Sequence, residues 1–110
     1  MNIKKIPEKN NFPTTETDIL RSIRQVLEIY GFFCIRIQQG LGCHKGISDI
    51  IIIKDGHVTF VEIKKPKGKL SKHQERFSKD ISSRGGDYVV FRDLDEAMEF
   101  IKNINKREAL

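Results

Sequence analysis

The sequence predicts an α/β domain in which helices flank a mixed β-sheet, with the element order α-β-β-β-α-β-α. Two observations support this fold class. Three segments place apolar residues at helical spacing, and runs rich in β-branched and aromatic residues separate them. The last of these runs lies between two helices, and such a β-α return favours a sheet covered by helices on both faces.

The first helix is expected to begin after Thr15, whose side chain can cap it, with Asp18 three residues further on. Apolar residues then recur at helical spacing up to Gly31, which is suited to end a helix. Residues 32–37 are predicted to form the first strand. Residues 38–46 contain three glycines and are predicted to form a loop.

An Asp-Gly pair at residues 55–56 predicts a β-hairpin, because it separates two runs of β-branched and aromatic residues. A two-residue turn at this point would pair Lys54 with His57. Counting outward from that pair places Asp49 directly opposite Glu62.

Asp49, Glu62 and Lys64 form the candidate catalytic centre. Directly opposed residues have Cβ atoms about 4.5–5.5 Å apart, and two carboxylates there repel each other unless a cation lies between them. Lys64 shares a face with Glu62, because side chains alternate along a strand. The alternative is an ordinary surface hairpin. The unbroken apolar run 50–53 argues against it, because a strand buried on both faces leaves its terminal acids partly desolvated.

The second half of the chain is predicted to form a helix, a strand and a final helix. Ser71 and Gln74 have the spacing of a capping box at the start of the first of these helices. Two glycines at 85–86 end it, residues 88–91 form the strand, and Asp93 caps the final helix.

The length of 110 residues suits one domain with a single core. We expect a flexible arm over residues 1–13, the domain over 14–105 and a frayed end over 106–110. No apolar run approaches the ~18 residues of a membrane helix and no secretory signal is visible, so a cytoplasmic protein is expected without membrane contact. The two cysteines lack the spacing of a zinc site.

Basic residues follow the candidate centre closely, in a chain whose formal net charge is +5. Such a cluster favours a polyanionic partner, most commonly a nucleic-acid backbone. The alternative is a lysine-rich loop that is merely solvated. The candidate DNA-binding residues are Lys45, Lys65, Lys67, Lys69, Lys72 and His73.

Four elements in this order resemble the VRR-NUC branch of the PD-(D/E)xK nuclease superfamily. They are an acid in the first helix (Glu16), the Gly-Ile-Ser-Asp step at 46–49, the Glu-Ile-Lys step at 62–64, and the Gly-Lys-Leu-Ser-Lys-His-Gln run at 68–74. The resemblance covers about residues 14 to 92 and implies a restriction-endonuclease-like core. Ser48 departs from the pattern, because the branch usually has proline before the aspartate.

The resemblance implies roles for individual residues. Asp49 and Glu62 correspond to the main metal-binding carboxylates, joined by the backbone carbonyl of Ile63. Oxygen ligands of this kind suit Mg²⁺ or Mn²⁺. Lys64 corresponds to the lysine that positions the attacking water and stabilises charge near the phosphate, and whether it also acts as a base stays open.

Glu16 and Gln74 each have two interpretations. Glu16 lies on the core-facing stripe of its helix, which is unusual for a glutamate and favours metal or water binding. The alternative is the ordinary preference for acids in a first helical turn. The family glutamine at Gln74 helps to orient the lysine or the water, whereas the capping box with Ser71 explains the residue without catalysis.

Small standalone members of this branch are similar to four-way-junction resolvases that work as homodimers. The resemblance therefore implies a metal-dependent endodeoxyribonuclease that acts on branched DNA such as Holliday junctions, in DNA repair or recombination. Such small nucleases suit a phage or mobile-element genome. The alternatives are a less selective flap or nicking nuclease that needs a partner protein, a non-catalytic DNA-binding module, and an RNA-processing nuclease.

Overall fold

The computed structural model describes residues 15–108, and the side chains of residues 15–106. Within that range the elements follow the predicted order α-β-β-β-α-β-α. They are α1 (Glu16–Ile29), β1 (Phe33–Arg36), β2 (Ile50–Lys54), β3 (His57–Ile63), α2 (Lys72–Ser82), β4 (Asp87–Phe91) and α3 (Leu94–Glu108).

The two ends of the chain compare differently with their predictions. The arm predicted for residues 1–13 lies outside the described residues. At the other end α3 continues to Glu108, so the frayed segment expected from residue 106 is helical over its first three residues. Ile101 and Ile104 are buried, and they hold the last turns of α3 before residue 106 against the core.

The four strands form one mixed sheet in the order β1-β2-β3-β4. β1 and β3 run antiparallel to β2, and β4 runs parallel to β3. The predicted hairpin register is confirmed, because Lys54 pairs with His57. Both turn residues have positive φ, 52° at Asp55 and 82° at Gly56, which is the conformation of a type I′ turn.

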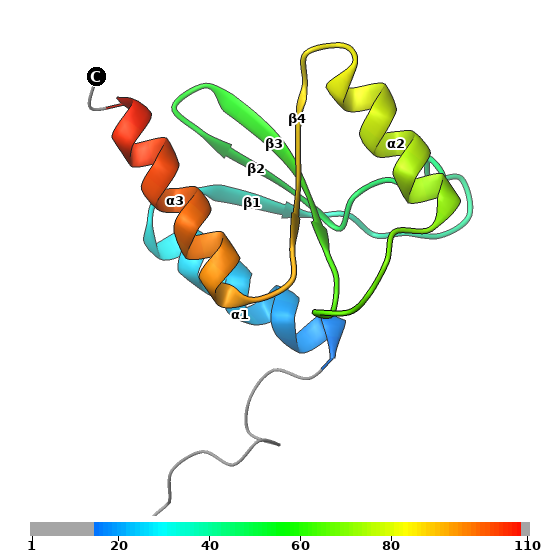
Figure 1. Ribbon diagram of the computed structural model, residues 1–110, viewed down its shortest axis with the longest axis horizontal. Helices are drawn as coiled ribbons and strands as arrows, with labels where there is room; N and C mark the ends of the chain where they lie inside the picture. The colour runs from blue at the N-terminus through cyan, green and yellow to red at the C-terminus, as the bar shows by residue number, and fades with distance from the viewer. Residues whose placement is uncertain (1–14, 109–110) are drawn as a thin grey trace, which may run out of the picture.

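Helices cover both faces of the sheet, as predicted: α1 and α3 lie on one side and α2 on the other (Figure 1). The main core fills the space between the sheet and the α1–α3 pair. Its largest fully buried aliphatic side chains are Ile23, Leu27, Ile50, Ile52, Val61, Ile63 and Ile101. Within residues 15–108 no helix is both long and apolar enough to cross a membrane.

A smaller aromatic cluster fixes α2 on the opposite face. The ring centroid of Phe77 lies 5.6 Å from that of Phe60 and 6.0 Å from that of Tyr88. α2 covers only part of this face. Phe33 and Val58 are 65% and 44% exposed, and they are joined in one cross-strand row through Ile53.

The loop between β1 and β2 lies directly against the first turn of α2. A Cβ atom at Gly46 would collide with the backbone carbonyl of His73, and Gly46 has a φ of +80°. The His44 ring lies 5.6 Å from that of Phe77 and holds the same loop against the helix. Glycine at 46 therefore allows the loop to reach the place where α2 begins.

The predicted helix caps are present. The Thr15 hydroxyl accepts a hydrogen bond from the Asp18 N–H at 3.0 Å. The Asp93 carboxylate accepts one from the Glu96 N–H at 2.9 Å. The Ser71 capping box at the start of α2 is complete, and its partner residue also belongs to the candidate site.

Candidate active site

Asp49 and Glu62 meet at the open end of the hairpin. Asp49 directly precedes β2, and its N–H donates to the Val61 carbonyl at 3.0 Å. Its Oδ2 accepts a hydrogen bond from the Ile63 N–H at 2.8 Å. These bonds hold Asp49 beside the last residues of β3, next to Glu62, close to the position that the hairpin register predicted.

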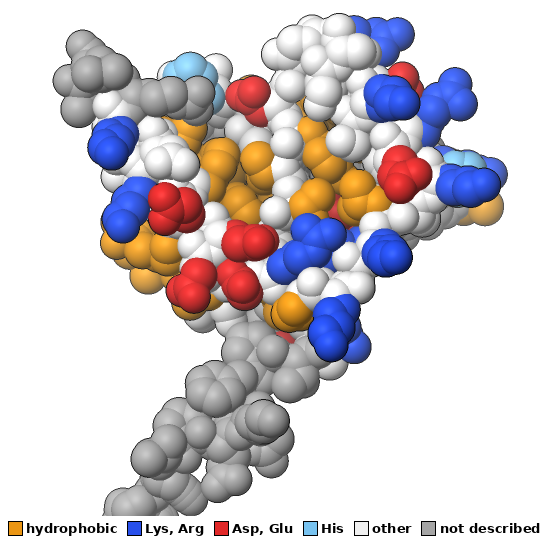
Figure 2. Space-filling model, viewed as in Figure 1, with side chains coloured by type: hydrophobic (Ala, Val, Ile, Leu, Met, Phe, Trp, Pro, Cys, Tyr) orange, Lys and Arg blue, Asp and Glu red, His pale blue; other side chains and the backbone are white. Residues whose placement is uncertain are grey.

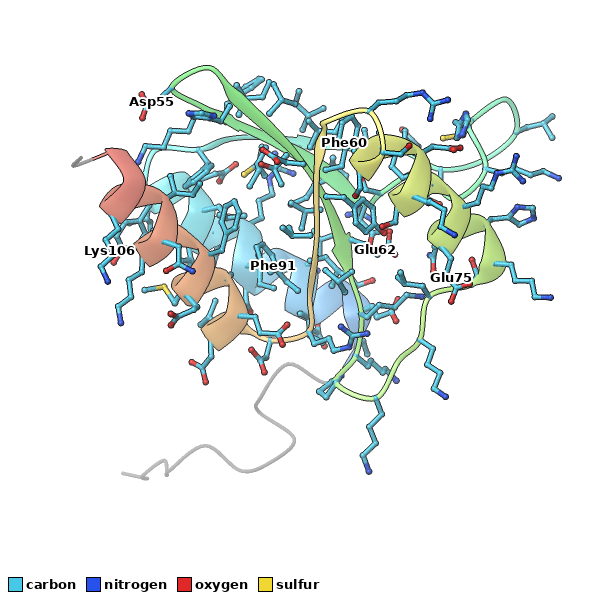
Figure 3. All side chains as sticks on the ribbon, turned by 45° about the horizontal axis from the view of Figure 1, so that its top comes forward. Asp55, Phe60, Glu62, Glu75, Phe91 and Lys106 are labelled. Carbon is cyan, nitrogen blue, oxygen red and sulfur yellow. The ribbon has the colours of Figure 1, made fainter. Side chains whose placement is uncertain are left out.

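The Glu62 side chain points from β3 toward α2 and is almost completely buried, with 2% of its surface exposed (Figure 3). Its Oε2 accepts a hydrogen bond from Gln74 Nε2 at 3.0 Å. Its Oε1 is also buried and has no hydrogen-bond partner among the described residues. A buried carboxylate oxygen in this state needs a proton, a water molecule or a cation.

The surroundings of Glu62 raise its pKa to about 8. Burial is the largest cause, followed by the charge of Asp49, while the charge of Lys64 lowers the pKa. In the absence of a cation, the Glu62 carboxyl group therefore keeps its proton at neutral pH. A divalent cation would take the place of that proton.

The donors at this point fit a hard divalent cation. Two carboxylates and the adjacent main chain of Ile63 offer oxygen ligands, and Mg²⁺ usually keeps several water ligands as well. Among the described side chains, no three His, Cys, Asp or Glu residues are close enough to hold one ion together. A metal here would therefore rest on Asp49 and Glu62, completed by main-chain oxygen and water.

Glu16 lies at the edge of this site rather than in the core. Its side chain is exposed, whereas Leu20, one turn later on the same stripe, is buried. Both residues line a cavity of about 110 Å³ that also borders Asp49 and Ile63. The charge of Glu16 contributes to the raised pKa of Glu62. Glu16 thus faces the acid pair without forming a three-carboxylate group with it.

Gln74 forms the predicted helix cap and also contacts one acid of the candidate site. Its Oε1 accepts from the Ser71 N–H at 2.8 Å, which completes the capping box. Its Nε2 donates to Glu62, so the same amide also orients the buried acid. The amide contacts Glu62 and not Lys64, although the lysine was one of its predicted targets.

Lys64 follows β3 and is half-buried, and its backbone N–H donates to the Phe91 carbonyl at 3.1 Å. Its side chain runs close to Gly68, where a Cβ atom would lie 3.5 Å from Lys64 Cδ. Within the described part of the chain its ammonium group forms no ion pair. A positive charge next to the acid pair is therefore available to water or to a phosphate oxygen.

All six predicted DNA-binding side chains are exposed. Lys65, Lys67 and Lys69 lie in the loop after β3, and Lys72 and His73 lie in the first turn of α2. Lys45 lies in the loop that contacts this turn. Figure 2 shows basic side chains over α2 and the loop before it, and acidic side chains over the start of α3.

The structure adds three residues that the sequence reasoning missed. Gln39 donates through Nε2 to the Ile47 carbonyl at 3.1 Å and to Asp49 Oδ1 at 3.4 Å. Arg36, at the end of β1, lines two cavities that border Asp49. The Tyr88 hydroxyl is buried without a described partner, and its pKa is raised by burial and by the charges of Glu62 and Asp49.

No motif in the sequence marks these three residues. Gln39 lies in a loop whose path depends on its contact with α2. Arg36 ends an edge strand, and Tyr88 lies in a strand predicted only for its apolar character. One signal was available for Arg36. If β1 had been paired with β2 from the sequence, Arg36 would have been placed opposite Ile50, next to Asp49.

The comparisons with known proteins agree with this fold. The model of the VRR-NUC domain family matches residues 11–93. A solved structure titled "VRR_NUC domain" superposes with a TM-score of 0.71 at 21% sequence identity, covering 79% of this chain and 94% of that chain. No curated protein matches the chain. Because the family match spans well over half of its length, the chain belongs to the VRR-NUC family and has the fold of PD-(D/E)xK-like nucleases.

Proposed function

We propose that the protein is a Mg²⁺- or Mn²⁺-dependent endodeoxyribonuclease that hydrolyses phosphodiester bonds. The observation that supports this most directly is the buried, partnerless Oε1 of Glu62 next to Asp49. A buried glutamate that is protonated in the absence of metal, next to a second carboxylate, is a suitable place for a divalent cation. The nuclease fold and the lysine next to the acid pair, Lys64, also support this proposal.

Each side chain of this site has a separate role in the proposed reaction. A bound Mg²⁺ or Mn²⁺ supplies Lewis acidity and lowers the pKa of a coordinated water. Asp49 is held by the Ile63 N–H and by Gln39, and Glu62 is held by Gln74, so both carboxylates are oriented before a ligand arrives. Lys64 places a positive charge beside them, where it stabilises charge that develops on the phosphate.

The proposed substrate is branched DNA, with four-way junctions first among candidates, in DNA repair or recombination. Contacts from Lys65, Lys67 and Lys69 to phosphates would bind DNA without reading bases, which suits selection by shape. A homodimer would present two equivalent sites to a junction of near two-fold symmetry. The exposed row through Phe33 and Val58 offers apolar surface for such an association.

The test is cleavage of labelled four-way junction, flap and linear duplex DNA, and of a matched RNA duplex, with Mg²⁺, Mn²⁺ or EDTA. Glu62→Gln preserves shape and should abolish cleavage, while Glu75→Gln, an exposed acid on α2, should cleave like the wild type. Sedimentation of the same samples would report the oligomeric state.

The products distinguish the alternatives. Symmetric nicks in the junction alone, lost with EDTA, would support a resolvase. Equal cutting of all DNA substrates would keep the nuclease and remove the junction preference. Binding without metal-dependent cutting of any substrate would contradict the nuclease proposal and favour a DNA-binding module.

A further inference from the structure

Arg36 is the last residue of β1 and pairs with Ile50, the residue after Asp49. Ile50 in turn pairs with Val61 of β3. The end of β1, the start of β2 and the end of β3 therefore lie at one edge of the sheet. Asp49 lies at this edge, with Arg36 on the β1 side of it and Lys64 on the β3 side.

The Arg36 side chain is exposed and makes no hydrogen bond or ion pair with any described residue. This distinguishes it from the other arginines with described side chains. Four of these form ion pairs with carboxylates, and one donates to the carbonyl of Gly68; they are Arg21, Arg24, Arg76, Arg84 and Arg92. A guanidinium without a protein partner is available to a ligand.

Two cavities meet at this residue. The larger, of about 670 Å³, is lined by residues 36–39 and Asp49. The smaller, of about 110 Å³, lies toward Glu16 and Ile63. Arg36 and Asp49 are the two residues that line both. Arg36 thus lies where the two cavities meet beside Asp49.

We propose that Arg36 binds the substrate, with its guanidinium contacting non-bridging oxygens of a nucleic-acid backbone phosphate in the larger cavity. This inference rests on the proposed function, because the proposed nucleic-acid substrate provides the phosphate that Arg36 would bind. A planar guanidinium matches a phosphate with two parallel hydrogen bonds. The nucleic-acid strand would then be held on both sides of Asp49. Lys64 and the lysine-rich loop after β3 would bind it on one side, and Arg36 on the other.

If Arg36 had only a structural role, its removal would have different effects. If Arg36 only offset the negative charge of Glu16, Asp49 and Glu62, its removal would tighten binding of a cation and leave DNA binding unchanged. If it only stabilised β1, its removal would lower the melting temperature. Contact with phosphate predicts weaker DNA binding instead, with folding intact.

The experiment compares Arg36→Ala and Arg36→Lys with Lys102→Ala, a control that removes one exposed positive charge from α3, away from the proposed DNA-binding face. Dissociation constants for labelled four-way junction and duplex DNA are measured in EDTA across a salt series. Mn²⁺ affinity without DNA and the melting temperature are measured in parallel. Cleavage rates are measured at several DNA concentrations, so that KM and kcat are determined separately.

For Arg36→Ala we expect about tenfold weaker DNA binding and a salt slope smaller by about 1, with unchanged or tighter Mn²⁺ binding. Arg36→Lys should recover part of the affinity. DNA affinity within twofold of the wild type, or a loss explained by a lower melting temperature, would overturn the inference. Because binding is measured without metal, it decides the role of Arg36 even if the wild type cuts no substrate, an outcome that would defeat the nuclease proposal alone.

Discussion

Glu62 shows how burial changes the chemistry of one residue. Gln74 satisfies one of its carboxylate oxygens, and the other is buried without a described partner. Burial and the charge of Asp49 raise its pKa to about 8, from an ordinary value of 4.5. The residue is therefore protonated in the metal-free protein over a range in which the unfolded chain is ionised.

This difference predicts that the metal-free protein loses stability as the pH rises from about 4.5 to about 8. In that window the folded state binds more protons than the unfolded state, so deprotonation favours unfolding. Below the window both states are protonated, and above it both are ionised, so the loss levels off. Glu62→Gln should remove this slope and be more stable than the wild type at pH 8.

Urea unfolding in EDTA across this pH range would measure the effect, with Glu75→Gln as the control. Mn²⁺ at pH 8 should raise the melting temperature of the wild type and leave that of Glu62→Gln unchanged. Parallel pH curves for the wild type and Glu62→Gln would contradict the raised pKa.

Gln74 allows its two roles to be separated. Gln74→Ala removes both the cap and the hydrogen bond to Glu62, and should cost about 1–2 kcal/mol of stability together with activity. Gln74→Glu can still form the capping box but places a carboxylate against Glu62. We expect it to cleave poorly as well. Wild-type cleavage by Gln74→Glu would show that residue 74 acts only as a cap.

At the scale of elements, α2 provides the cover that buries Glu62. Phe77 holds the helix on Phe60 and Tyr88, and the loop around Gly46 lies against its first turn. The position of Gln74 therefore depends on a loop that is distant in sequence. The site is built by packing between elements as much as by the hairpin.

Gly46→Ala is predicted to displace the first turn of α2. The new Cβ would collide with the His73 carbonyl, and alanine is strained at a φ of +80°. We expect a loss of about 2–4 kcal/mol and most of the cleavage activity. Gly42→Ala is the matched control, because Gly42 has a φ of +86° with no atom within 4 Å of its Cβ position. Denaturant unfolding and cleavage assays that rank both variants alike would refute the contact.

At the scale of the whole molecule, charge is unevenly distributed. Basic side chains lie over α2 and the loop that precedes it, and acidic ones over the start of α3 (Figure 2). A field of this kind directs a polyanion toward the candidate site and away from α3. The proposed DNA-binding face is accordingly the α2 face.

This asymmetry predicts that Lys67→Ala and Lys69→Ala each weaken DNA binding to a similar degree for all sequences. Each should reduce the slope of log K against log salt by about 1, because each removes one phosphate contact. Lys102→Ala on α3 removes the same charge from an exposed position elsewhere and should leave the slope unchanged. Equal slopes for all three variants would place the binding face elsewhere.

Much of the fold was predictable because its signals are local. The Asp-Gly turn determines the hairpin register up to the pair Ile50–Val61, and this register brings Asp49, the residue before Ile50, close to Glu62, the residue after Val61. Thr15, Ser71 and Asp93 cap helices through contacts three residues away in sequence. The extent of α3 to Glu108 has no such local signal, because the length of this helix depends on the burial of Ile104 against the core.

The order of elements, the approach of the two acids and the adjacent lysine were predictable, because they follow from turn chemistry and strand alternation. The burial and raised pKa of Glu62, its contact with Gln74, and the places of Gln39 and Arg36 beside Asp49 become visible only in the folded protein. These properties depend on the distance between segments that are far apart in the chain. Such distances are set by how α2 and the β1–β2 loop pack together, and no local pattern encodes them.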